Sequence, residues 1–208
     1  MLGKVGLLRY NAKILLRKEF LAGLIYLLFL PVIFNFRLLT LKEAATIGEI
    51  YFSLFGVIFL TSIIELDFLD GVAELVAIKK INPERTFFLR MMMIIIILSI
   101  CTLSLYCYML FQGSEFPISE LFLGTLVTQI SLGLLGVTAA NLSRNLPFGY
   151  LFGVSYFFLE FLSQGRFTQR FYLFGLTQGD VESKYYLLLA SLLLIWVNWS
   201  ILKRRKIN

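Results

Sequence analysis

The residues with the clearest potential for chemistry are the carboxylates of one charged stretch, DFLDGVAE, from Asp67 to Glu74. Asp67 and Asp70 are three residues apart, and paired carboxylates are ligands that a divalent cation prefers. Two carboxylates alone do not make a metal site. The next aspartate in the chain is Asp180. The sequence therefore predicts no metal site and no catalytic residue here.

Other catalytic groups are scarce. The chain has no histidine, which excludes histidine metal sites, histidine general bases and serine–histidine triads. Its two cysteines, Cys101 and Cys107, lie inside one apolar run and are expected to be reduced core residues. No G-x-x-x-x-G-K-[S/T] sequence is present, so no loop can cradle the phosphates of a nucleotide. We therefore expect the chain to be no enzyme and to hold no cofactor.

Apolar residues dominate the rest of the chain. They make up 59% of its 208 residues, and the mean hydropathy is +0.83. A soluble domain is nearer half apolar, and several runs here approach the roughly 20 residues that cross a bilayer as a helix. We expect a single all-α transmembrane domain over residues 1–208, with a cytoplasmic interfacial amphipathic helix at 1–19. Six transmembrane helices are predicted, at 20–36, 47–65, 87–111, 121–142, 147–162 and 185–202.

Basic residues give the predicted orientation. With the N-terminus in the cytoplasm, all but five of the nineteen Lys and Arg residues fall on the cytoplasmic side, in agreement with the positive-inside rule. The five on the outer side are Arg37, Lys42, Arg166, Arg170 and Lys184. Arg90 opens the third span and is expected to snorkel to the headgroups. The prediction is a multi-pass protein of a bacterial cytoplasmic membrane, with both termini in the cytoplasm.

The charged segment 66–86 then lies in the cytoplasm, between the second and third spans. Asp70 and Glu74 are four residues apart, on one side of a helix. A short helix across the membrane face would suit the docking of a soluble partner. An ordinary intracellular loop that obeys the positive-inside rule is the alternative interpretation, and the residues alone leave both open.

Several features resemble the ABC-2 type permease family, the membrane subunits of ABC exporters. In that family a basic amphipathic helix ends in an acid before the first span, here ILLRKEF, and a D-G-x-x-E motif follows the second span, here Asp70 to Leu75. A base opens the third span, here Arg90, and the last span ends in a short basic tail, here KRRK. The family usually has a proline about six residues after the glutamate of the motif. In this chain Lys80 occupies that position, and the proline comes later, at Pro83.

The resemblance implies a function and partners. Segment 66–86 would be the coupling helix, seated on a dimer of a separate ABC ATPase subunit that binds ATP and Mg²⁺ and hydrolyses the nucleotide. The implied contacts are Asp70, Gly71, Glu74, Leu75, Lys79 and Lys80. One such permease is half of a translocation pathway, so a second copy or a sister permease is implied, within membrane lipid and without nucleic acid. The implied cargo is a hydrophobic peptide, a drug or a lipid-like compound.

Polar residues of the fourth and fifth spans are the candidates for lining a pathway. Thr125, Thr128 and Gln129 lie at membrane depth, where they face either a substrate path or hydrogen-bond partners on other helices. Glu160 is an acid near the outer end of the fifth span, a costly position that indicates function or snorkelling to water. In the fourth span, close helix packing is favoured by Gly124, Gly133 and Gly136.

The segment 163–184 is expected to form short helices on the outer membrane surface. In the ABC-2 family that region resembles an outer gate, and a lipid-facing anchor is the alternative. Within the transporter class, a permease subunit for cytochrome c maturation is similar in its D-G-x-x-E stretch and its fourth span. A membrane assembly or sensor subunit that moves nothing is a hypothesis of another class. The CDP-alcohol phosphotransferases share the Asp67-x-x-Asp70-Gly71 start, but not the rest of their motif.

Overall fold

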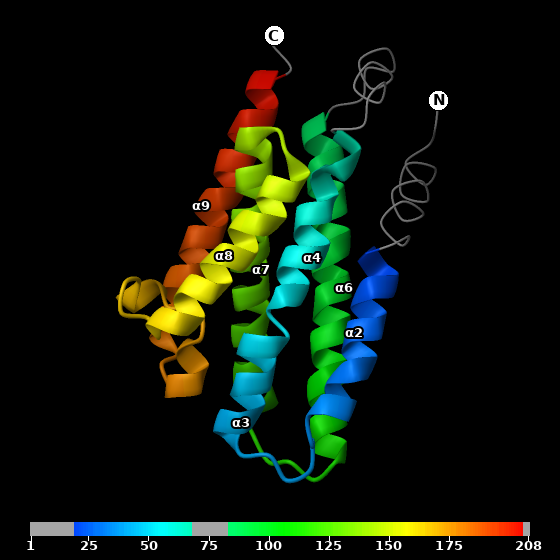
Figure 1. Cartoon of the computed structure of the whole chain (residues 1–208), viewed down its shortest axis with the longest axis vertical. Helices are drawn as coiled ribbons and strands as arrows, with labels where there is room; N and C mark the ends of the chain where they lie inside the picture. Colours follow the sequence, from blue (N-terminus) through cyan, green and yellow to red (C-terminus); the bar gives the residue numbers. More distant parts are fainter. Residues whose placement is uncertain (1–18, 68–82, 206–208) are drawn as a thin grey trace.

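The computed structural model describes residues 19–67 and 83–205. All regular secondary structure in these two ranges is helical, with no β-strand. Figure 1 shows the long helices running side by side along the long axis of the molecule. In chain order the elements are α2 (Glu19–Ile33), α3 (Leu41–Thr46), the π-helix η1 (Ile47–Tyr51), α4 (Leu54–Thr61), the 3₁₀ helix η2 (Ser62–Asp67), α6 (Pro83–Phe111), α7 (Ile118–Ser143), α8 (Leu146–Ser163), the 3₁₀ helices η3 (Gln169–Phe171) and η4 (Gly175–Gln178), and α9 (Glu182–Arg205).

Among the described residues, five helical stretches are long and apolar enough to cross a membrane, so the chain is a multi-pass membrane protein. They are Leu41–Ile64, Glu84–Phe111, Ile118–Ser143, Leu146–Ser163 and Glu182–Arg204. These stretches correspond to the second to sixth predicted spans. The predicted first span overlaps α2, of which the structure describes the 15 residues from Glu19 to Ile33.

The second span begins at Leu41, well before the predicted start at residue 47. Thr40 and Glu43 form a capping box: the backbone N–H of Thr40 donates to Glu43 Oε2 at 2.8 Å, and the backbone N–H of Glu43 donates to Thr40 Oγ1 at 3.4 Å. This box satisfies two backbone donors at the helix end. The polar sequence TLKE is therefore the first turn of the helix, although hydropathy alone indicates a loop.

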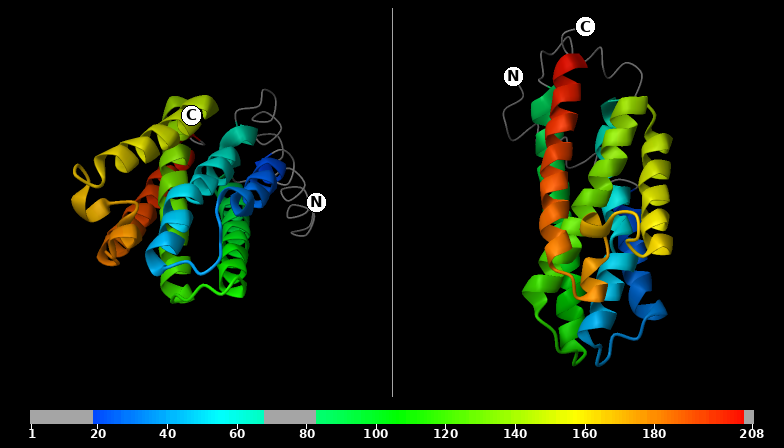
Figure 2. Two further views of the ribbon diagram at one scale, coloured as in Figure 1. Left: turned by 60° about the horizontal axis from the view of Figure 1, so that its bottom comes forward. Right: turned by 90° about the vertical axis from the view of Figure 1, so that its left-hand side faces the viewer.

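Helix α7 lies in the middle of the bundle and packs against α4, α6, α8 and α9. Figure 2 shows α7, α8 and α9 running beside one another (right view). Glycines bring the backbones close: Gly56 and Gly133 lie at the α4–α7 contact, and Gly136 and Gly149 at the α7–α8 contact. Gly124 lies against η4. The predicted role of Gly124, Gly133 and Gly136 in close packing is confirmed.

Arg90 corrects one sequence-based expectation. Its side chain does not snorkel to the membrane surface but lies in the bundle, 6% exposed. There Nη1 donates a hydrogen bond to the carbonyl oxygen of Ile63 at 3.2 Å. A backbone carbonyl in η2 is within reach of the guanidinium, so the buried donor is satisfied inside the protein.

The connections alternate between the two ends of the bundle (Figure 1). Helix η2 ends, α6 begins and α9 ends at one end, at the top of the view. The α2–α3 and α6–α7 connections lie at the opposite end. The "α8–α9 segment", residues 164–181, contains η3 and η4 and folds back against the bundle. Its buried residues are Tyr172, Leu173, Phe174, Gly175 and Leu176.

Candidate functional site

A buried ion pair joins α9 to the second span. Lys184 Nζ contacts Glu49 Oε1; Glu49 is fully buried and Lys184 is 6% exposed. Both residues belong to stretches able to cross the membrane, Leu41–Ile64 and Glu182–Arg204. Charged side chains at such positions are expensive, and in membrane proteins they mark functional pathways or switches more often than plain structure. We therefore take this pair as the centre of the candidate site.

The position of Glu49 depends on a local break in the second span. Glu49 lies in the π-helix η1, in which the N–H of Phe52 donates to the carbonyl oxygen of Ile47 at 3.0 Å. Beside it, Gly48 has no side chain, and the hydroxyls of Tyr106 and Thr125 occupy that space. A π turn holds one residue more than an α turn, which re-aims the side chains on either side of it, and such turns are frequent at functional sites.

Further hydrogen bonds complete the surroundings of the ion pair. Lys184 Nζ also donates to Thr128 Oγ1 at 2.9 Å and to the carbonyl oxygen of Leu173 at 2.5 Å. The backbone N–H of Thr177 donates to Glu49 Oε2 at 3.2 Å. The ammonium thus has three oxygen partners, drawn from the second span, α7 and the α8–α9 segment. Such a satisfied network fixes these elements relative to one another.

Glu160 is a second buried acid that binds the same segment. Its side chain is fully buried, and Oε2 accepts hydrogen bonds from Thr168 Oγ1 at 2.9 Å and from the backbone N–H of Leu173 at 3.4 Å. The sequence left open whether Glu160 snorkels to water. The structure places its carboxylate under the α8–α9 segment instead, with backbone and hydroxyl donors in place of water.

The predicted pathway residues of α7 lie inside the protein. Thr125, Thr128 and Gln129 are all fully buried. Thr125 Oγ1 and the hydroxyl of Tyr106 are 2.6 Å apart, and Gln129 Nε2 donates to the carbonyl oxygen of Phe52 at 3.2 Å. These contacts are the interhelical hydrogen bonds that the sequence offered as an alternative to a substrate path. A role in lining a pathway stays a prediction.

Polar pairs continue between α7 and α9 toward the other end of the bundle. The hydroxyls of Ser131 and Ser191 are 2.7 Å apart. Asn141 Nδ2 donates to Asn198 Oδ1 at 2.7 Å, and Asn198 Nδ2 donates to Thr138 Oγ1 at 2.8 Å. All five side chains are buried. These polar contacts fix the register of the two helices along most of their length.

Tyr172 is the titratable group of the α8–α9 segment that the site affects most. Its ring is buried, 7% exposed, and packs edge-on against Phe174, with ring centroids 5.7 Å apart. Burial raises the pKa of the Tyr172 hydroxyl above its usual value, and the nearby carboxylates of Glu160 and Glu49 raise it further. The surroundings of Tyr172 therefore favour its neutral phenol over the charged phenolate.

The predicted coupling residues fall on a part of the chain that the structure does not describe. Asp70, Gly71, Glu74, Leu75, Lys79 and Lys80 lie within 68–82, outside the described residues, as does the predicted interfacial helix up to residue 18. Within 19–67 and 83–205, no group of three or more His, Cys, Asp or Glu side chains is placed to hold a metal ion.

Sequence reasoning missed both members of the central ion pair. Glu49 lies within the predicted second span, and Lys184 was assigned to the outer loop, directly before the predicted sixth span. The usable signal was an acid in an apolar run, since a buried acid needs a base or hydrogen-bond donors from elsewhere in the fold. Comparison of the chain with protein-family models, with curated proteins and with solved structures found no match.

Proposed function

We propose that the chain is the permease subunit of an ATP-driven exporter, in which it forms half of a translocation pathway and couples to a separate ABC ATPase. In this proposal α2 completes a six-helix ABC-2 type domain in a bacterial cytoplasmic membrane, with both termini in the cytoplasm. The protein acts as a pair of permeases, two copies of this chain or this chain and a sister subunit, with a dimer of the ATPase. Its cargo is a hydrophobic peptide, a drug or a lipid-like compound.

The buried Glu49–Lys184 ion pair is the observation that carries the proposal. Apolar side chains of similar volume at these two positions would stabilise the fold as well as the ion pair does, or better. The reason is that the cost of desolvating two charges offsets most of their attraction. The pair joins the second span and α9 to the α8–α9 segment, which folds back against the bundle. A buried charged contact between two helices and such a segment suits a protein that changes between two arrangements during transport.

The elements that flank the charged segment support the coupling half of the proposal. The described parts of η2 and α6 next to it lie at the same end of the bundle as the last described turn of α9 (Figure 1). In the sequence, the Asp70–Leu75 motif and the basic tail after α9 then belong to one membrane face. An ATPase seated on that face would meet Asp70 and Glu74 directly, and charge complementarity would set its register.

The test is co-purification of an ATPase with the tagged, full-length chain from native membranes in a mild detergent. Mass spectrometry should identify a stoichiometric protein that carries a Walker A sequence. The double variant Asp70→Lys/Glu74→Lys should lower its recovery at least about tenfold, because reversed charges at an interface oppose binding. Glu115→Lys/Glu182→Lys is the matched control: it makes the same change in charge at two exposed positions, Glu115 in the α6–α7 connection and Glu182 at the start of α9.

Two results would contradict the proposal in different ways. Full recovery of the ATPase with the Asp70→Lys/Glu74→Lys variant would contradict the proposed coupling role of segment 66–86. If no ATPase is recovered even after chemical crosslinking, the exporter function itself fails, and the assembly or sensor subunit becomes the better hypothesis. Elution of each variant as a single membrane-extracted species in size-exclusion chromatography controls for misfolding.

A further inference from the structure

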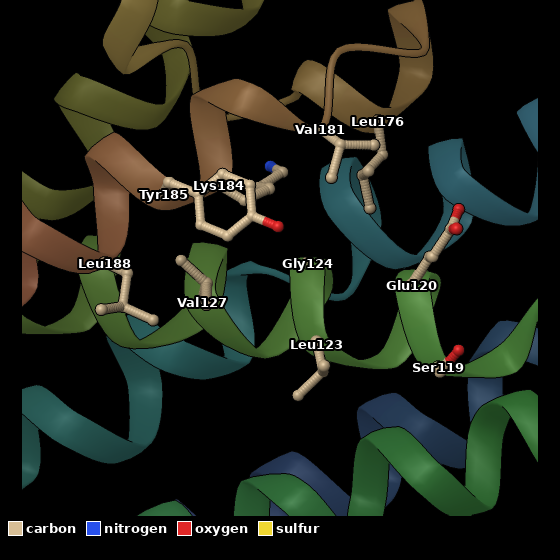
Figure 3. A pocket seen from close by; sticks show the side chains of 10 residues that line it. All are labelled: Ser119, Glu120, Leu123, Gly124, Val127, Leu176, Val181, Lys184, Tyr185 and Leu188. Atoms are coloured by element: carbon tan, nitrogen blue, oxygen red, sulfur yellow. The ribbon is translucent and has the colours of Figure 1, made fainter.

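A pocket opens between the first turns of α7 and α9, where η4 covers it (Figure 3). Its volume is about 250 Å³, and its walls are mostly apolar. Leu123, Val127, Leu176, Val181 and Leu188 supply the hydrocarbon lining. Figure 3 shows these side chains around the space between the two helices and the turn before α9. The pocket is separate from Glu160, and it touches the central ion pair only through Lys184.

The mouth of the pocket faces outward from the bundle. Leu123, Tyr185 and Leu188 are 58%, 69% and 44% exposed. They lie on helices that are able to cross the membrane, so their exposed surface faces lipid or the membrane interface. A ligand would therefore enter sideways from the bilayer, and it would arrive with an apolar part first.

The net charge near the mouth of the pocket is negative. Glu120 lines the pocket and is exposed, and Asp180 immediately precedes the lining residue Val181 and is exposed as well. Within the described ranges neither carboxylate forms an ion pair, whereas the charge of Lys184 is compensated by Glu49. An approaching cation is thus attracted, and an anion is repelled.

We propose that this pocket binds a single-chain amphiphilic amine, with its alkyl chain between α7 and α9 and its ammonium near Glu120 and Asp180. The volume decides the size of the ligand: it exceeds the roughly 150 Å³ of an apolar cavity that holds benzene, and it is below the roughly 300–1,000 Å³ of drug-sized sites. One chain fits, and two chains do not. The proposal does not depend on the exporter function.

The test uses the purified full-length chain in phosphatidylcholine nanodiscs and two photoreactive probes. The probes are decylamine and decyl sulfate, each with a diazirine at the end of the chain, and labelled peptides are identified by mass spectrometry. Decylamine should label the peptides that contain Leu123, Val127 and Leu188 saturably, about fivefold more than decyl sulfate does. Unlabelled decylamine should compete, and dioleoyl phosphatidylethanolamine, a two-chain amine, should not.

Variants separate the two halves of the site. Leu188→Trp should fill the pocket and abolish the saturable labelling, and Leu192→Trp, one turn further along α9 and 55% exposed, should not. Glu120→Gln/Asp180→Asn should keep labelling but remove the preference for the amine. This variant also covers the case in which Leu188→Trp fails to fold, because Asn can replace Asp180 as the cap of α9.

Labelling that does not saturate would overturn the proposal, as would equal labelling by decyl sulfate in the unaltered protein. Equal competition by the two-chain lipid would overturn it too, because the occupant would then be a bilayer phospholipid.

Discussion

Glu160 and Lys184 bind the two backbone groups of the same residue, Leu173. The N–H of Leu173 donates to Glu160 Oε2, and its carbonyl oxygen accepts from Lys184 Nζ. The two charged side chains come from α8 and α9, the helices that the α8–α9 segment connects. The segment is thus held at its midpoint by the helices at its two ends, and its position should depend on both side chains.

The central ion pair gives a prediction on stability. Glu49→Gln or Lys184→Met alone should lower the free energy of unfolding by about 3–5 kcal/mol, because each leaves the partner charge buried and uncompensated. Glu49→Leu/Lys184→Met together should cost less than either single change. Thermal unfolding of the purified protein in detergent measures both, and Glu182→Gln on the same turn, exposed, is the control. Additive losses in the double variant would contradict this account of the pair.

Glu160 should control the mobility of the α8–α9 segment. Glu160→Leu removes the acceptor for Thr168 and for the N–H of Leu173, at a cost of about 1–3 kcal/mol. Amide hydrogen exchange of residues 165–181 should become much faster, with little change in α7. Glu160→Gln keeps an acceptor oxygen and should restore most of the protection. Equal exchange in the two variants would show that the segment does not depend on an acceptor at position 160.

The α4–α7 contact should tolerate no added carbon at Gly56. A β-carbon there would meet the backbone of Gln129, which cannot move aside as a side chain can. Gly56→Ala should therefore destabilise the protein by about 1–3 kcal/mol. Gly153→Ala is the matched control on α8, because its new methyl group would meet the side chain of Val57 at 3.0 Å and the backbone of Gly136 only at 3.8 Å. Similar melting temperatures for both variants would contradict the close approach.

Tyr172 predicts a specific alkaline instability. Its pKa is raised in the folded state, so the folded protein binds the phenol proton more tightly than the unfolded chain does. The stabilisation is complete below the usual tyrosine pKa of about 10 and is lost as the pH rises through the higher folded value. As the pH rises from about 9 to about 11, the free energy of unfolding should therefore fall less in the Tyr172→Phe variant than in the unaltered protein. Parallel pH profiles of melting temperature would exclude Tyr172 as the source.

Features that depend on a partner far away in the sequence could not be predicted from the sequence. The spans α6, α7, α8 and α9 follow from the length of apolar runs, which is a local property, and were predicted closely. The start at Leu41 was missed because Lys42 and Glu43 look like loop residues, and only the capping box makes them helical. The position of Arg90 was predicted wrongly and the burial of Lys184 was missed for one reason: hydropathy places a charge at the membrane edge unless a distant partner is known.

The candidate site shows the same division. Thr125, Thr128 and Gln129 were singled out because polar residues at membrane depth are visible in one span alone. Their individual partners, Tyr106, Leu173 and Phe52, come from other elements, and no spacing along α7 identifies them.

The π turn at η1 also divides one span into two parts with different neighbours. α3 contacts η4 and α7, while α4 contacts α2, α7 and α8. One surplus residue in a turn rotates the helix before it by about 100° relative to the helix after it. Loss of one residue from Ile47–Tyr51 would straighten the span and turn α3 away from η4 while α4 stayed in place. Single-residue deletions should therefore be as harmful here as in a buried strand, even where every remaining side chain is unchanged.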